Sequence, residues 1–174
     1  HKGGYTPFQF NVSGKLKEKD NHLIVKVDNK RKREAIPTIN TDWWNYGGIT
    51  RSVHLINVPN NHIVDYGINF IKNEKNNIQG WVTLSDKNNN DVIIEIPELN
   101  KKLSIVASNG IAYFQFRAKP ELWSPKNPKL YKLTIKSSLD SISDDIGFRT
   151  IETSGHEILL NGKPIFLKGI SIHE

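Results

Sequence analysis

Hydrophobic and polar residues alternate with a period of two along most of this chain. Phe8, Phe10 and Val12 alternate with polar residues, and Leu23, Val25 and Val27 share one face of the next segment. A period of two is typical of β-strands, whose side chains point alternately to opposite faces. The pattern predicts strands at residues 8–12, 23–27, 53–57, 63–71, 78–85, 91–96, 102–107, 111–118, 130–137 and 146–152.

A hairpin is predicted near the C-terminal end. Residues 157–160 and 164–170 are apolar segments that flank Asn161-Gly162. The Asn-Gly pair tolerates the positive φ angles of a type I′ turn, which makes it the clearest turn signal in the chain.

No stretch of ten or more residues has the 3.6-residue period of an amphipathic helix, and residues 95–102 contain Pro97. The chain is therefore predicted to be all-β. Residues from about 60 to 152 supply about seven short strands separated by turns, which favours an immunoglobulin-like antiparallel β-sandwich. Its predicted core faces are carried by Val82 and Leu84, Phe114 and Phe116, and Leu133 and Ile135.

The net charge is +6, from 24 basic and 18 acidic residues, and the densest basic stretch is Lys30-Arg-Lys-Arg33. Such a stretch indicates either a nucleic-acid patch or a solvated loop. The other basic residues are scattered and no aromatic residues interleave with them for base stacking, which favours the loop. We expect no nucleic-acid partner.

The chain has no cysteine, so it forms no disulfide and no thiolate metal site. No apolar run approaches the ~18 residues of a membrane span, and no membrane partner is expected. The histidines lack ligand spacing and no glycine loop is suited to phosphate, so neither a metal nor a cofactor is expected. The composition fits the periplasm and the cytoplasm equally.

The densest cluster of candidate binding residues is the block Thr41-Asp-Trp-Trp-Asn-Tyr-Gly-Gly48. Aromatic faces stack on sugar rings, while Asp42 and Asn45 offer oxygens and an amide to hydroxyl groups. The block indicates either a carbohydrate surface or an aromatic loop that packs on a neighbouring domain. Composition alone favours packing.

Two further segments are predicted to be architectural. Pro125 and Pro128 stiffen the loop that carries Trp123, which we expect to be an anchor in the core or between domains. Arg149 is expected to pair with a carboxylate at a domain interface.

The last segment predicts a strand that ends in His173-Glu174. Enzymes with a (β/α)₈ barrel keep their chemistry at the C-terminal ends of the strands, so this strand is expected to open a barrel. Adjacent strand positions point to opposite faces, so His173 and Glu174 are not expected to converge on one substrate. A histidine ending an apolar strand is also commonly a structural residue.

Five motifs together resemble glycoside hydrolase family 2, the β-galactosidase and β-glucuronidase family, in the family's order and along the whole chain. They are His1-Lys-Gly-Gly-Tyr-Thr-Pro-Phe8, Asp42-Trp-Trp-Asn-Tyr-Gly-Gly-Ile-Thr-Arg51, Leu122-Trp-Ser-Pro-Lys-Asn-Pro-Lys-Leu-Tyr131, Gly147-Phe-Arg149, and Asn161-Gly-Lys-Pro164 through His173-Glu174. The resemblance implies that residues 1–57 are the C-terminal part of a jelly-roll sugar-binding domain. It implies an immunoglobulin-like sandwich at 58–152, and an entry hairpin and first strand of a TIM barrel at 153–174.

The resemblance also implies a function. Family members hydrolyse β-glycosidic bonds with retention, using two glutamates that lie in the barrel, beyond residue 174. The chain is thus expected to be a non-catalytic fragment of a β-galactosidase-like enzyme, inactive alone. Asp42 and His173 match substrate-positioning residues of the family, Trp43 and Asn45 match its pocket rim, and Arg51 matches a structural position. The expected partner of the whole enzyme is a β-glycoside.

One alternative function stays open on the sequence. A free-standing β-sandwich carbohydrate-binding or adhesion module would explain the strands, but not the apolar seam at Leu159-Leu160 and Ile165-Phe-Leu167. Exposed strand edges in the first segment would favour a homo-oligomer.

Overall fold

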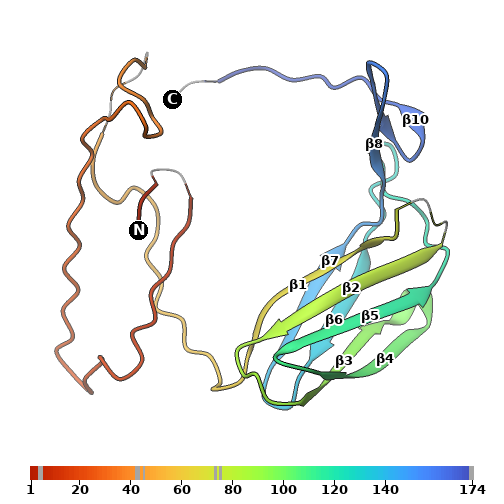
Figure 1. The fold of residues 1–174 in the computed structure, drawn as a ribbon, viewed down its shortest axis with the longest axis horizontal. Coiled ribbons are helices and arrows are strands. Elements are labelled where there is room, and N and C mark those ends of the chain that lie inside the picture. Colours follow the sequence, from red (N-terminus) through yellow and green to blue (C-terminus); the bar gives the residue numbers. More distant parts are fainter. Residues whose placement is uncertain (4–5, 42–43, 45, 73, 75, 173–174) are drawn as a thin grey trace. The chain divides into compact units, whose positions relative to one another are not determined.

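The computed structural model describes residues 1–3, 6–41, 44, 46–72, 74 and 76–172. The chain divides into two units, residues 1–56 and 57–174 (Figure 1).

The second unit contains an antiparallel β-sandwich, which confirms the predicted all-β class and sandwich. One sheet has the order β1-β2-β5 and the other the order β4-β3-β6-β7. Figure 1 shows these strands as two groups of arrows, with β1 and β7 at neighbouring edges. The strands are β1 (Ile63–Phe70), β2 (Asn77–Leu84), β3 (Asn90–Ile96), β4 (Lys101–Ala107), β5 (Ile111–Arg117), β6 (Tyr131–Lys136) and β7 (Ser141–Ile146), with the 3-10 turn η1 (Pro97–Leu99) between β3 and β4.

The core lies between the two sheets. Its fully buried members are aliphatic, and Phe114 and Phe116 are 8% exposed, with ring centroids 6.3 Å apart. The predicted inward faces of three strands are thereby confirmed, since Val82, Leu84, Leu133 and Ile135 are buried as well. Each large side chain buried here contributes about 1.5–3 kcal/mol.

A small three-stranded sheet follows the sandwich, formed by β8 (Ile151–Ser154), β9 (Glu157–Leu160) and β10 (Lys163–Pro164). The predicted β9–β10 turn is confirmed, because Asn161 and Gly162 both have positive φ angles, of 54° and 75°. The predicted second strand at 164–170 is wrong beyond Pro164. After Ile165 N–H donates to Ile158 O, the described residues up to 172 have no ladder partner.

The prediction of one strand at 146–152 is also wrong. Residues 147–150 separate β7 from β8, and Trp123 N–H donates to Phe148 O at 2.8 Å. The backbone of Phe148 thus pairs with the Trp123 loop instead of a sheet. Strand β7 was missed because Ser141, Ser143, Asp144 and Asp145 give it no apolar alternation.

The three strands predicted at residues 8–12, 23–27 and 53–57 are absent. The described part of residues 1–56 has no helix and no strand, and its red-to-orange trace carries no arrow in Figure 1. Alternation supplies an apolar face, but a strand also requires a hydrogen-bonded neighbour. Local hydrogen bonds in turns occupy some of these backbone groups instead. For example, Lys17 N–H donates to Asn21 Oδ1, and Asn21 Nδ2 donates to Lys17 O.

Candidate functional site

The four residues predicted to contact substrate are Asp42, Trp43, Asn45 and His173, and all four lie outside the described residues. Their convergence on one ligand stays a prediction. The described aromatic neighbours Trp44 and Tyr46 are 81% and 82% exposed, and Ile172 is 71% exposed. Both predicted segments thus place large apolar side chains in solvent.

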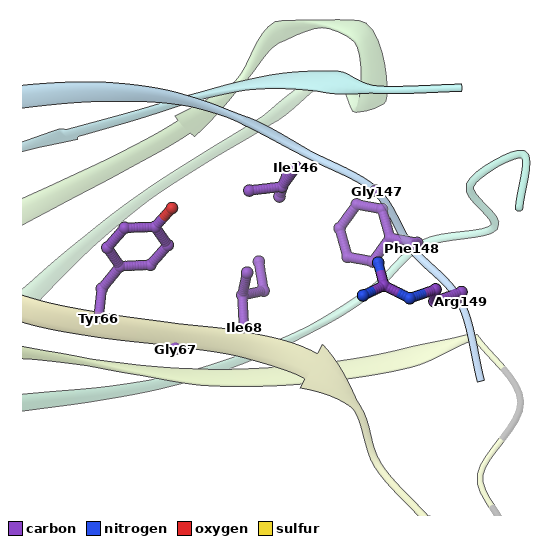
Figure 2. A pocket seen from close by; sticks show the side chains of 7 residues that line it. All are labelled: Tyr66, Gly67, Ile68, Ile146, Gly147, Phe148 and Arg149. Carbon is purple, nitrogen blue, oxygen red and sulfur yellow. The ribbon is translucent and has the colours of Figure 1, made fainter. Parts of the chain in front are cut away.

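The described part of the second unit has a cavity of about 290 Å³ between edge strand β1 and the end of β7. Figure 2 shows Tyr66 and Ile68 on one strand facing Ile146 on the other. The residues that line it are Tyr66, Gly67, Ile68, Ile146, Gly147, Phe148 and Arg149. The cavity contains a single permanently charged group, the Arg149 guanidinium.

Arg149 does not make the predicted carboxylate contact within the described residues. Its guanidinium carbon lies 5.3 Å from the centroid of the Trp123 ring, in a cation–π arrangement. Gly147 permits this packing, since a Cβ at that position would lie 3.1 Å from Trp123 Cδ1. The pair thus fixes the segment after β7. Trp123 is half-buried and lies outside the core cluster, and its predicted role as an anchor between domains stays a prediction.

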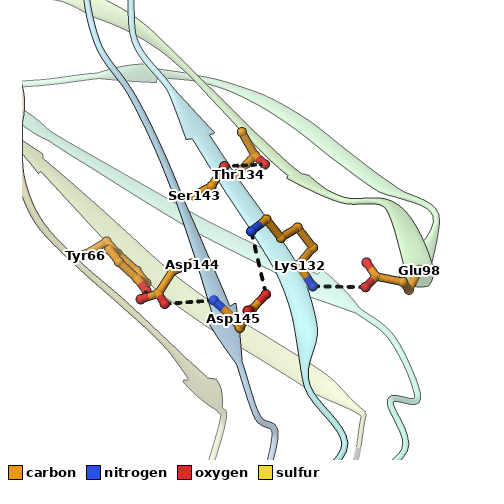
Figure 3. Close-up of polar contacts among 7 residues, drawn as sticks. All are labelled: Tyr66, Glu98, Lys132, Thr134, Ser143, Asp144 and Asp145. Carbon is orange, nitrogen blue, oxygen red and sulfur yellow. Dashed lines mark hydrogen bonds and ion pairs between the residues drawn. The ribbon is translucent and has the colours of Figure 1, made fainter.

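A polar contact closes the same side of the sandwich (Figure 3). The Tyr66 hydroxyl donates to Asp144 Oδ2 at 2.5 Å, and Asp145 N–H donates to Asp144 Oδ1 at 2.8 Å. Burial, followed by the hydrogen bond to Asp144, raises the pKa of the Tyr66 phenol to about 12. The same hydrogen bond lowers the pKa of the Asp144 carboxyl.

The described carboxyl groups with shifted pKa values are all more acidic than usual. The Lys136 and Lys102 ammonium groups lie 2.7 and 2.9 Å from the Glu95 carboxylate and lower its pKa to about 2. Backbone N–H groups of Lys132 and Asn88 lower the pKa values of Glu98 and Asp86. A general acid instead requires a raised pKa, so these three carboxylates and Asp144 are suited to structure and not to proton donation.

No group of three or more histidine, aspartate or glutamate residues in the described ranges is placed to hold a metal ion. No helix among those residues is long and apolar enough to span a membrane.

The sequence analysis missed the Tyr66–Asp144 contact. The two residues are 78 positions apart, and each belongs to a strand with a different partner. No local pattern reports such a contact, and the only sequence signal was a tyrosine at an inward-facing position.

Comparison with known proteins points to one family. A family model described as "Glycosyl hydrolases family 2" matches residues 54–149. A protein named "Putative beta-glucuronidase" from Formosa agariphila is 30% identical over the whole of this chain and 23% of its own length. A beta-galactosidase from Priestia megaterium is 27% identical over 98% of this chain and 19% of its own length.

A solved beta-glucuronidase from Ruminococcus gnavus is 26% identical over 64% of this chain and 19% of that chain, with a TM-score of 0.49. The chain spans about a fifth of the length of the relatives that it matches.

Proposed function

The chain belongs to glycosyl hydrolases family 2, and from that premise we propose that it is the non-catalytic framework of a retaining β-glycosidase. The observation that carries the proposal is the family match over residues 54–149, together with relatives matched along almost the whole chain. The whole protein hydrolyses a β-glycoside, with β-galactosides and β-glucuronides as the substrates to test first.

Retaining hydrolysis needs a nucleophilic carboxylate and a general acid/base about 5–5.5 Å apart, the acid having a raised pKa. In the described residues Glu95, Glu98 and Asp144 are each held by donors that favour the ionised form. These three carboxylates are thus poor candidates for the acid, and the proposal assigns the working pair to a barrel that follows this chain.

The proposed contribution of the chain to substrate is positioning. Asp42 accepts hydrogen bonds from sugar hydroxyls, His173 contacts the sugar from the first barrel strand, and Trp43 and Asn45 form the rim. Side chains at adjacent positions of a strand point to opposite faces, so Glu174 is not assigned a catalytic role beside His173.

The proposed organisation is the C-terminal part of a jelly-roll domain at residues 1–57, the sandwich at 58–152, and the entry hairpin and first barrel strand at 153–174. The exposed apolar side chains of Phe166, Leu167 and Ile170 support a covering barrel. The whole enzyme is also proposed to be a homo-oligomer, which light scattering of the purified protein tests.

Covalent trapping in the whole enzyme tests the mechanism and the location of its nucleophile together. An activated 2-deoxy-2-fluoro-β-galactoside or β-glucuronide forms a long-lived glycosyl ester on the nucleophile of a retaining enzyme. Peptide mass mapping is expected to find the label on a glutamate outside residues 1–174. A label on any glutamate of this chain, or release of product with inverted configuration, contradicts the proposal.

Substitutions in the same enzyme test the positioning roles. Asp42→Asn and His173→Ala are expected to reduce kcat/KM by about 10- to 100-fold, because each removes a contact to the sugar. Asp20→Asn, at an exposed position with the same change of charge, is the matched control. Wild-type kinetics in both site variants would remove Asp42 and His173 from the site.

A further inference from the structure

The outer face of the β1-β2-β5 sheet presents two adjoining rows of side chains. The strand register aligns Gly67, Trp81 and Tyr113 across the three strands. Two positions away along each strand, it aligns Asn69, Gln79 and Gln115. Adjacent strands are about 4.8 Å apart, and positions two residues apart are about 7 Å apart. The two rows therefore cover an area comparable to one or two sugar rings.

The first row carries two aromatic side chains, Trp81 and Tyr113, on neighbouring strands. A Cβ at Gly67 would lie 2.7 Å from Trp81 Nε1 and 2.9 Å from Trp81 Cε2, so the indole lies over the backbone of this glycine. Tyr113, directly opposite Trp81 on β5, is 70% exposed. A glycine inside a strand weakens it, and such a position often marks the close approach of another group. Here it lets the indole lie low over β1, while Tyr113 stands on β5, on the other side of β2.

The second row consists of three exposed carboxamides, those of Asn69, Gln79 and Gln115. In the described part of the chain, none of these side chains has a hydrogen-bond partner, and neither does Trp81 Nε1–H. Each carboxamide offers two N–H donors and an acceptor oxygen without a charge. This combination matches the vicinal hydroxyl groups of a sugar, which both donate and accept.

The outer face of the other sheet has different chemistry. It carries Glu95 bound to Lys102 and Lys136, and Lys132 lies 3.8 Å from Asp145. Five of its charged groups are thus paired with one another, and no aromatic residue stands among them. The aromatic and amide groups are thus concentrated on one face of the sandwich.

We propose that the β1-β2-β5 face is a binding site for a neutral oligosaccharide. One sugar ring stacks on Tyr113, and the next places its hydroxyls on Gln79 and Gln115, with the Trp81 indole at the border of the site over β1. The ligand is uncharged because both rows are uncharged, although the chain as a whole carries a net charge of +6. Such a site attaches the protein to a polysaccharide. This proposal does not depend on whether the proposed catalytic assignment is correct.

A nuclear magnetic resonance titration of the 174-residue chain tests this site directly. Cellopentaose and β-1,4-galactotetraose are the neutral probes, and trigalacturonate is the anionic probe. At least one neutral probe is expected to shift the Trp81 indole N–H signal and the Gln79 and Gln115 carboxamide signals, with a Kd of about 1 mM or tighter. The proposal is overturned if neither neutral probe causes saturable shifts, or if trigalacturonate binds more tightly than the neutral probes.

Two surface variants locate the site and two others control for it. Tyr113→Ala is expected to weaken binding at least about tenfold, and Gln115→Ala several-fold. The backbone spectra of both variants are expected to be unchanged away from the substitution. Lys102→Ala and Thr134→Ala, on the opposite outer face, are expected to leave binding unchanged. Equal binding by Tyr113→Ala and wild type overturns the proposal.

The same titration with the whole enzyme tests whether the face is accessible there. A Tyr113→Cys variant is expected to react with a maleimide at similar rates in the 174-residue chain and in the whole enzyme. Complete protection in the whole enzyme would identify the face as an interface between domains and overturn the proposal.

Discussion

The Tyr66 hydroxyl donates a 2.5 Å hydrogen bond to Asp144 Oδ2 and so joins edge strand β1 of one sheet to edge strand β7 of the other. A second contact lies on the same side, where Ile63 N–H donates to Asp140 Oδ2 at 2.9 Å. Together they close a side of the sandwich at which no backbone ladder connects the two sheets. Two aspartates thus stabilise an open edge in a chain without disulfides.

Replacement of Tyr66 by phenylalanine tests this closure. Tyr66→Phe is expected to lower the free energy of unfolding by about 1–2 kcal/mol, because Asp144 loses its side-chain donor while the ring remains. Urea unfolding followed by fluorescence measures the change. Tyr113→Phe removes a hydroxyl from an exposed ring and is expected to change stability by less than about 0.5 kcal/mol. Equal effects in both variants would contradict the role of the contact.

The same contact predicts a loss of stability at alkaline pH. The pKa of the Tyr66 phenol is raised to about 12 in the folded state, against 10.0 for the free side chain. The unfolded chain therefore releases this proton first, and stability present below pH 10 falls as the pH rises towards 12. Because solvent screens charges at this exposed edge, the free energy of unfolding is expected to fall by roughly 1–2 kcal/mol over this pH range. Tyr66→Phe is expected to abolish this loss. An identical alkaline profile in that variant would contradict the assignment.

Glu95 is expected to respond to acid and to salt. Its pKa is lowered to about 2 by Lys136 and Lys102, so its contribution to stability is present above pH 4.5 and is lost as the pH falls towards 2. Side-chain carbon chemical shifts report this pKa directly. We expect it to rise in 1 M salt and in Lys136→Met, because both weaken the ion pairs. If the pKa of Glu95 is the same in 1 M salt and in Lys136→Met as in the wild type, the lysines do not set it.

Gly80 is expected to tolerate no side chain. An added Cβ would overlap the Phe114 ring and the backbone carbonyl oxygen of Gly67, and the backbone atom cannot swing away. Gly80→Ala should therefore destabilise the chain by at least about 2 kcal/mol in thermal or urea unfolding. Gly169→Ala is the matched control, since nothing lies within 4 Å of the position of its added Cβ. Similar stability of the two variants would contradict the packing described for β2.

Asn161 is expected to hold the small sheet to the sandwich. Its Oδ1 accepts from Thr150 N–H and its Nδ2 donates to Trp123 O, both at 3.0 Å. Asn161→Ala should accelerate hydrogen exchange of the Thr150 amide by about 10- to 30-fold, whereas Asn161→Asp keeps the acceptor and should have a smaller effect.

Asn109→Ala provides the control for backbone strain. Asn109 also has a positive φ, of 52°, but it lies in the β4–β5 turn. It should leave exchange at Thr150 unchanged, and faster exchange in that variant would point to global destabilisation instead.

The sequence predicted most of the sandwich because its core residues are both apolar and regularly spaced. Phe114 and Phe116 on β5, and Leu133 and Ile135 on β6, alternate with exposed residues, so burial and pattern agree. The Asn161-Gly162 turn was predictable from two residues, since its positive φ angles are a local requirement.

The remainder depends on contacts that a local pattern does not contain. Strand β7 is held by its pairing with β6 and by the hydrogen bond of Asp144 to Tyr66. Its own sequence is mostly polar, so no apolar alternation predicts the strand. In residues 1–56 the reverse holds, because Leu23 and Val25 alternate like strand residues but have no ladder partner. The predicted binding residues Asp42 and His173 came from family motifs alone, and they stay predictions.

The central claim is that this chain is a framework that lacks the catalytic carboxylates. The most direct measurement is the release of p-nitrophenol from p-nitrophenyl β-D-galactoside and β-D-glucuronide by the purified 174-residue chain. We predict a rate equal to that of the boiled chain for both substrates, with turnover only in the whole enzyme. Turnover by the chain alone, well above the boiled control and abolished by substitution of one of its own glutamates, would contradict the account.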